Sequence, residues 1–229
     1  MTSTIPGKEI SEFYNSASPY NQVKDNDMLL LLEEGSFVPH LVKVIDVFSG
    51  RGGTAPTPQT VEFLGFNTVI QGNWGGVYGS QGYSLFGWDN NSDLISLPSY
   101  VSSLSVGGSR YQWTGNTNDV RGLPGNSLNT GTRKANTSYA NPTINIDISV
   151  NDSSFHKLTL YSLDWDNQGR QFTLNLINLS TGATEATANL TDAKPGVYSS
   201  FRFKGYTRLQ VIKTAGENCV ISGIFFDAP

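Results

Sequence analysis

The chain has 229 residues, a formal net charge of −4 and only 15% charged residues, together with 24 Gly, 12 Phe and 10 Tyr. Without a basic surplus, nucleic-acid binding is not expected, and no apolar run reaches the roughly 20 residues that a membrane-inserted helix needs. This composition favours a loop-rich β protein with polar, uncharged surfaces, long enough for one large β domain and a smaller module.

The opening sequence, MTSTIPGKEISEFY, has neither a basic region nor an apolar core of signal-peptide type, so we expect synthesis in a cytosol. Cys219 is the single cysteine, which predicts a small buried apolar residue and no intrachain disulfide. With two histidines in the chain, a zinc site is not expected.

Charge is unevenly distributed along the chain. Residues 1–50 carry seven acidic and three basic residues, whereas the remaining 179 carry twelve of each sign. The sequence around residues 51–59 is rich in Gly, Pro and Thr, as linkers are. We therefore expect an N-terminal assembly module over 1–50, a linker over 51–59 and a β domain over 60–229.

The N-terminal module is predicted to be a β-hairpin closed by a short helix. Residues 27–32 and 36–38 are expected to be strands around a turn at Glu33-Glu34-Gly35, and apolar residues from Leu41 to Phe48 follow at helical spacing. A strand that is apolar on both faces needs cover on both sides, so this module should bury itself against other chains. The predicted assembly residues are Met28, Leu29, Leu30, Leu31, Leu32 and Phe37.

Residues 9–48 resemble the N-terminal attachment modules of tailed-phage fibres and other virion appendages. The resemblance lies in the short element Ile-Ser-Glu-Phe, the apolar run ending in Glu-Glu-Gly, and Val-Pro-His-Leu-Val-Lys-Val-Ile-Asp-Val-Phe. An ordinary N-terminal β-hairpin is the alternative. The resemblance implies a homo-oligomer, with a trimer favoured, in contact with other virion proteins.

From residue 60 onward the chain is predicted to be β throughout. Short alternating segments occur at regular spacing, without long helical patterns, which argues for a sandwich or jelly roll. The polar, Gly- and Asn-rich segment 116–141 is expected to be an irregular surface segment. Strands are expected at 61–66, 83–88, 101–106, 111–113, 144–150, 158–163, 172–176, 201–203, 209–211 and 220–226.

Residues 158–176 are predicted to form a β-hairpin, because two alternating segments flank an Asx- and Gly-rich turn. Its tip holds Asp164, Asp166 and Arg170, which could form a structural network bridged by the guanidinium or bind sugar hydroxyls. A catalytic carboxylate pair is disfavoured, because a hairpin tip offers little enclosure to raise the pKa of a general acid. No other convincing catalytic set is present, so the chain is not expected to be an enzyme.

The loop over residues 71–83 combines glycines with aromatic residues. Aromatic faces stack on sugar rings, although most Trp side chains in a β-sandwich pack in the core. We assign Trp88 and Trp165 to packing and consider Trp74, Tyr78 and Tyr83 as carbohydrate contacts. Asp227, after the last strand, is a candidate ligand for a structural calcium, with loop carbonyls as further ligands; no other cofactor is expected.

Residues 68–227 resemble the galactose-binding-like β-sandwich domains appended to bacterial glycoside hydrolases and surface proteins. The residues concerned are the Gln-Gly-Asn-Trp-Gly-Gly-Val-Tyr loop, the Asp-Trp-Asp-Asn-Gln-Gly-Arg turn and the closing Val-Ile-Ser-Gly-Ile-Phe-Phe-Asp. The combined expectation is a phage structural protein, a fibre, tail or capsid-surface component, whose outer domain contacts host cell-surface glycans. The alternative is a carbohydrate-binding module of an exported bacterial hydrolase or surface protein.

Overall fold

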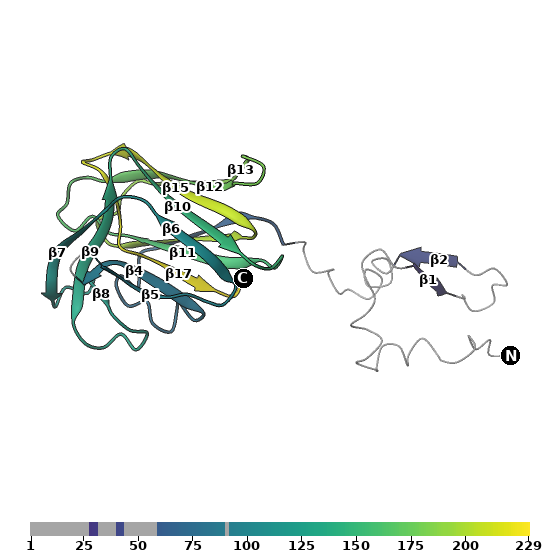
Figure 1. Ribbon diagram of the computed structural model, residues 1–229, viewed down its shortest axis with the longest axis horizontal. Helices are drawn as coiled ribbons and strands as arrows, with labels where there is room; N and C mark the ends of the chain where they lie inside the picture. Colours follow the sequence, from purple (N-terminus) through teal and green to yellow (C-terminus); the bar gives the residue numbers. More distant parts are fainter. Residues whose placement is uncertain (1–27, 32–39, 44–58, 90–91) are drawn as a thin grey trace. The chain divides into compact units, whose positions relative to one another are not determined.

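A computed structural model describes residues 28–31, 40–43, 59–89 and 92–229 (Figure 1). The chain divides into two units, Met1–Pro58 and Gln59–Pro229. Every element in the described part of the chain is a β-strand, in agreement with the expected mainly-β class.

Two short strands are described in the N-terminal unit. β1 (Met28–Leu31) pairs antiparallel with β2 (His40–Lys43), with Met28 opposite Lys43. The expectation that a helix begins near Leu41 is therefore wrong. A short apolar segment is compatible with the residue spacing of a helix and with that of a strand. As a strand, residues 40–43 form hydrogen bonds with backbone N–H and C=O groups of β1 that would otherwise have no partner in the strand. Leu32, Phe37, the expected turn and residues 44–48 lie outside the described residues.

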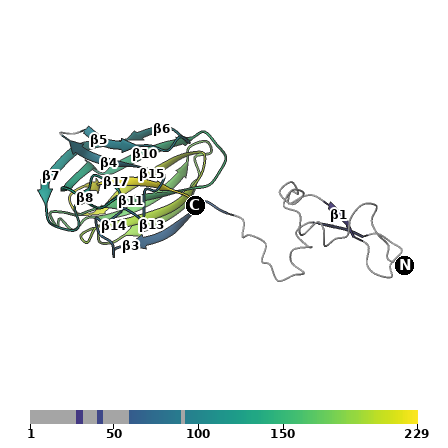
Figure 2. The same cartoon turned by 90° about the horizontal axis from the view of Figure 1, so that it is seen from below.

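The larger unit contains a five-stranded antiparallel sheet, which forms one layer of a β-sandwich (Figures 1 and 2). Its strands pair through Ile144–Val211 and Leu174–Val211 at the centre. Their order is β13 (Thr184–Leu190), β12 (Gln171–Asn178), β15 (Tyr206–Ala215), β10 (Thr143–Val150) and β6 (Val101–Val106).

A six-stranded antiparallel sheet forms the opposite layer. Its centre is β11, which pairs with β14 on one side and β17 on the other. The order across the sheet is β3 (Glu62–Asn67), β14 (Val197–Phe203), β11 (His156–Ser162), β17 (Gly223–Asp227), β4 (Gly82–Asp89) and β5 (Ser92–Ser96).

A third, smaller sheet lies at one end of the sandwich, away from the C-terminus, in both views (Figures 1 and 2). Its order is β16 (Cys219–Ile221), β9 (Arg133–Ala140) and β7 (Ser109–Thr117), with the two-residue β8 (Leu123–Pro124) also pairing with β9. Strand β9 falls inside the segment expected to be irregular, so that expectation is wrong over 133–140. β9 lacks a clean apolar alternation because five of its eight residues are charged or polar (Arg133, Lys134, Asn136, Thr137 and Ser138) and they lie on both faces.

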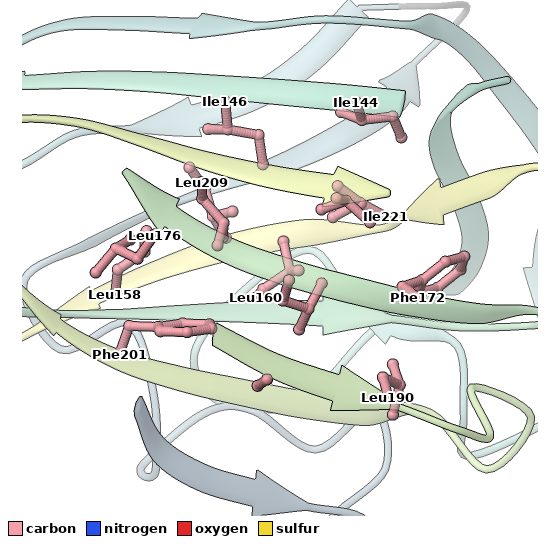
Figure 3. Packing of buried hydrophobic residues seen from close by; sticks show 14 of the residues in the cluster. Ile144, Ile146, Leu158, Leu160, Phe172, Leu176, Leu190, Phe201, Leu209 and Ile221 are labelled. Carbon is pink, nitrogen blue, oxygen red and sulfur yellow. The ribbon is translucent and has the colours of Figure 1, made fainter. Parts of the chain in front are cut away.

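The main core fills the space between the two large sheets. Alternate residues of each strand point inward, as strand geometry requires, and meet side chains from the opposite layer (Figure 3). Ile144 and Ile146 of β10 and Phe172 of β12 thereby lie in the same cluster as Leu158 and Leu160 of β11. Burial of this apolar area supplies the main driving force for folding of the unit.

The six-stranded sheet is also buried on its other face. Tyr161, Tyr198 and Phe225 point away from the main core and pack with Trp74 and Tyr78 from the segment before β4. The rings of Tyr78 and Tyr198 stack with centroids 4.6 Å apart. This second core explains why β11 is apolar or buried at nearly every position.

Residues 158–176 do not form a hairpin. β11 belongs to the six-stranded sheet and β12 to the five-stranded sheet, so the turn between them crosses from one layer to the other. The two strands pair elsewhere, β11 with β14 and β17 and β12 with β13 and β15. The expectation of a hairpin followed from the turn residues between the two strands. In the structure, the inward-facing apolar residues of β11 pack against those of β12 from the opposite layer of the sandwich.

Candidate functional site

One face of the small sheet carries exposed aromatic side chains. Tyr111 and Trp113 of β7 line the same pocket, although the pairing of β7 with β9 shifts register between Gln112 and Thr114. Tyr111 is paired with Thr137 of β9, which places Tyr139 beside it. Tyr111 is 52% exposed and Tyr139 is 36% exposed. This face therefore carries an aromatic platform of Tyr111, Trp113 and Tyr139, and Thr137 and Val220 line the same pocket.

The three rings are arranged edge to face rather than in one stack. The Tyr111 ring centroid lies 6.0 Å from that of Trp113 and 6.3 Å from that of Tyr139, with interplanar angles of 86° and 85°. The angled rings line an open pocket with a volume of about 390 Å³. That volume is within the range of small-ligand sites.

Two loops supply the polar side of this pocket, which we call the aromatic pocket. The turn between β11 and β12 contributes Asp166, Gln168 and Arg170, and the turn before β16 contributes Glu217 and Asn218. Aromatic faces beside a few polar groups are the usual composition of a small-ligand site. The predicted candidates Asp166 and Arg170 thus do lie in a concave site, with residues distant in sequence.

Arg170 is the organising residue of the polar side. Its Nη1 donates hydrogen bonds to the carboxylates of both Asp164 and Asp166, and its Nε donates to Asn218 Oδ1 at 2.9 Å. The Asp164 carboxylate also accepts from the backbone N–H of Gln168 and of Arg170, at 3.0 and 3.2 Å. The structural network expected for these residues is therefore confirmed, and it fixes the turn and Asn218 together.

The two carboxylates of this network differ in exposure. The Asp164 side chain is 2% exposed and lies behind the guanidinium, whereas that of Asp166 is 38% exposed and reaches the pocket. Although partial burial raises the pKa of Asp166, the hydrogen bond and charge of Arg170 lower it more, so its pKa is below the usual value. Asp166 is therefore an ionised acceptor at neutral pH, and Asp164 is structural.

Gly216 allows the two polar loops to touch. It has φ of +81°, and a Cβ at this position would lie 2.7 Å from Arg170 Cα and 2.9 Å from Gln168 O. Both the left-handed conformation and the close approach require glycine. The turn before β16 therefore packs directly on the backbone of the other loop and holds Glu217 and Asn218 at the rim.

The aromatic loop before β4 does not contribute to this pocket. Trp74 is completely buried and Tyr78 is 7% exposed, and the Trp74 indole N–H donates to Pro124 O at 3.0 Å. Trp74 therefore has no exposed ring face for a sugar, and Tyr78 has only a small exposed area, in a separate pocket beside β3. The expected contacts at Trp74 and Tyr78 are therefore not part of the aromatic pocket. Tyr83 is half-buried with its ring centroid 4.9 Å from that of Trp74, and it too belongs to the second core.

Asp227 holds the loop before β4 in place by hydrogen bonds and does not form a cation site. Its carboxylate accepts from the backbone N–H groups of Gly79 and Ser80, at 3.0 and 2.8 Å, and from the Ser80 hydroxyl at 2.8 Å. These neighbours are hydrogen-bond donors, whereas calcium requires oxygen ligands. Within the described ranges, no three His, Cys, Asp or Glu side chains are grouped so that they could hold a metal ion.

Several residues of the aromatic pocket were not identified from the sequence. The missed set is Tyr111, Trp113, Thr137, Tyr139, Gln168, Glu217, Asn218 and Val220. The spacings Tyr111-x-Trp113 and Thr137-x-Tyr139 did carry a signal, since both place aromatic or polar groups on one strand face. Only the pairing of β7 with β9 shows that these faces coincide.

The composition of the pocket suits recognition of a polyhydroxylated ligand. Flat apolar faces can cover the C–H groups of a sugar ring, while carboxylate and amide groups meet its hydroxyls. In the part of the chain that the structure describes, no helix could span a bilayer. The fold and the site together define a β-sandwich with an open pocket lined by aromatic and polar side chains.

Comparison with known proteins adds a distant, partial similarity. No protein-family model matches the sequence, and no curated protein matches it. Among solved structures, one that is similar in part is described as "Xyl-CBM35 in complex with glucuronic acid containing disaccharide". It is 15% identical, with a TM-score of 0.28, over 40% of this chain and 73% of that chain. So low a score does not carry a ligand over to this chain.

Proposed function

We propose that the Gln59–Pro229 unit is a non-catalytic carbohydrate-binding module, of galactose-binding-like type, that binds a glycan in the aromatic pocket. The observation that carries this proposal is the exposure of Tyr111 and Tyr139 beside Trp113, on a face that also presents Asp166 and Asn218. Large aromatic side chains left half-exposed gain from covering the apolar face of a sugar ring.

The position of the pocket suits outward presentation. The small sheet lies at the end of the sandwich away from the C-terminus (Figures 1 and 2). The first strand of the unit, β3, shares a shallow pocket with Ala228 and Pro229. Both ends of this unit therefore lie away from the aromatic pocket.

The affinity of one such pocket should be modest. An open site with few polar contacts is expected to bind at about millimolar Kd, roughly 4 kcal/mol. Adhesion to a glycan-covered surface would then depend on several copies acting together. The binding test must therefore use multivalent display, with soluble ligand titrations as the quantitative measurement.

The test is a glycan array probed with the full chain, followed by titration of each hit. Tyr111→Ala and Tyr139→Ala should each weaken binding by about tenfold, or ~1.4 kcal/mol. Tyr206→Ala is the matched control, because Tyr206 is 46% exposed on β15 of a different sheet. An array without hits, or equal binding by Tyr111→Ala and Tyr206→Ala, would contradict the proposal.

We further propose that the whole chain is a virion structural protein of a tailed phage, located in the virion and assembled with other virion proteins. The support is the run 28–32, which is apolar at every position in the sequence and includes β1. A two-stranded sheet has too little core to cover such a run, so a trimer or another homo-oligomer is favoured. A sedimentation mass equal to one chain would contradict this assembly.

A module of an exported bacterial hydrolase or surface protein is the alternative setting for the same glycan-binding unit. Genomic neighbours that encode tail or capsid proteins would favour the virion, whereas neighbours that encode polysaccharide-degrading enzymes would favour the alternative.

A further inference from the structure

We infer that the aromatic pocket selects uncharged or amino sugars and rejects glycans that carry a carboxylate or sulfate at the bound residue. This inference rests on the proposed glycan binding and adds the ligand class. It follows from three features of the polar side of the pocket: the engagement of its cation, the sign of its rim charges and the two carboxylates that can only accept hydrogen bonds.

The guanidinium of Arg170 is already committed. Besides Nη1, which serves both carboxylates, Nε donates to Asn218 and Nη2 lies 3.4 Å from Asp166 Oδ2. The side chain is 4% exposed. Four of its five N–H groups are thus engaged. A ligand carboxylate could pair with the guanidinium through two hydrogen bonds only by displacing Asp166 or Asp164 from it, and the displaced carboxylate would lose its partner.

The remaining charges near the pocket are mainly negative. Asp166 and the exposed Glu217 stand on the rim, with Asp164 behind them. The cations are Arg170 and Lys213, whose Nζ donates to the backbone carbonyl of Glu217 at 3.3 Å. Three carboxylates thus lie near two cations, and one of these cations, Arg170, already pairs with Asp164 and Asp166. An anionic ligand therefore meets like charge at the rim.

The hydrogen-bonding capacity of the rim points the same way. The carboxylates of Asp166 and Glu217 can only accept hydrogen bonds, whereas the amide of Asn218 and the hydroxyls of Tyr111 and Tyr139 can also donate. The Gln168 Nε2 donates within the turn, to Asp166 O at 3.2 Å. Sugar hydroxyls and ammonium groups can donate to the two carboxylates, which a carboxylate or sulfate of a ligand cannot do.

The experiment compares ligands that differ in charge at one position. Titrations of the full chain use methyl galactoside against methyl galacturonoside, methyl glucoside against methyl glucuronoside, and glucosamine against N-acetylglucosamine 6-sulfate. For each pair that binds, the neutral partner should bind at least about tenfold tighter at low salt. The preference for the neutral sugar should become smaller at high ionic strength, because salt screens the repulsion between the acidic ligand and the rim carboxylates.

Three variants test whether the rim charge is the cause. Glu217→Lys should reduce the neutral-over-acidic preference to about threefold or less, and Glu217→Gln should reduce it by an intermediate amount. Glu185→Gln is the control, since Glu185 is an exposed carboxylate on β13 of a different sheet. A preference in Glu217→Lys equal to that of Glu185→Gln would overturn the inference.

The outcomes separate this inference from the proposed function. Acidic partners that bind as tightly as neutral ones, with loss of binding in Tyr111→Ala, would overturn the charge selection and leave glycan binding intact. Absence of binding to either member of any pair, in the wild-type chain and in Tyr111→Ala alike, would overturn both the charge selection and the proposed glycan binding.

Discussion

Arg170 and Asp164 form an ion pair that is almost completely removed from water, with side chains 4% and 2% exposed. The pair lies where the chain crosses from the six-stranded to the five-stranded sheet. The same guanidinium holds Asn218 of the turn before β16. One buried side chain therefore joins the crossover, the small sheet and the polar side of the aromatic pocket.

Removal of Arg170 should be costly because it leaves Asp164 buried without its cation. We expect Arg170→Ala to lower the free energy of unfolding by about 3–5 kcal/mol, measured by urea denaturation at neutral pH. The matched control is Arg208→Ala. Arg208 also pairs with an aspartate, Asp147, but is 31% exposed, so its loss should cost less than about 1 kcal/mol. Equal losses in the two variants would show that the Arg170 pair is solvated.

Stability should fall in acid partly through Asp166. Arg170 holds the pKa of this carboxylate below its usual value, although burial opposes the shift. The folded state therefore binds its proton less readily than the unfolded state does, so the stabilisation is present above about pH 4 and is lost as pH falls through the folded-state pKa. Asp166→Asn should lose less stability than wild type between about pH 5 and pH 2. Parallel pH profiles from chemical denaturation would contradict this.

Trp74 should be a stability residue and not a ligand contact. Its side chain is fully buried and packs against Phe225, with ring centroids 5.1 Å apart. Trp74→Ala should therefore cost about 3–5 kcal/mol. Val69→Ala, in the same segment but 86% exposed, should change stability by less than about 0.5 kcal/mol. A stable Trp74→Ala variant that has lost glycan binding would contradict this assignment.

Gly216→Ala should damage both stability and the pocket. The added methyl group meets Arg170 Cα at 2.7 Å in a backbone of positive φ, so we expect a loss of about 2–4 kcal/mol and weaker glycan binding. Gly182→Ala is the control for conformation alone, because Gly182 has φ of +75° with no atom within 4 Å of the added carbon. Its cost should be about 1–2 kcal/mol, without an effect on binding. Equal melting temperatures for the two variants would exclude the proposed close packing of the loops.

The sequence by itself determined the β class and the location of most strands. Where a strand has one face in the core, its apolar residues alternate, as Ile144, Ile146 and Ile148 do on β10, and this period of two is a local property of the chain. Strand β9 was not predicted because most of its residues are polar, so no alternation of apolar and polar residues marks it in the sequence. The charge network at Asp164, Asp166 and Arg170 was also predictable, since its members are close in sequence.

Only the tertiary structure decided which faces meet. The residues around the crossover look like a hairpin, because turn chemistry is local while the choice of sheet partner is not. Trp74 is buried because the six-stranded sheet has a second covered face, which the Gly-rich loop does not reveal. Tyr111 and Tyr139 come together only through the register that pairs Tyr111 with Thr137. Pairing between distant strands depends on the packing of the whole core, and the aromatic pocket exists only once that packing is complete.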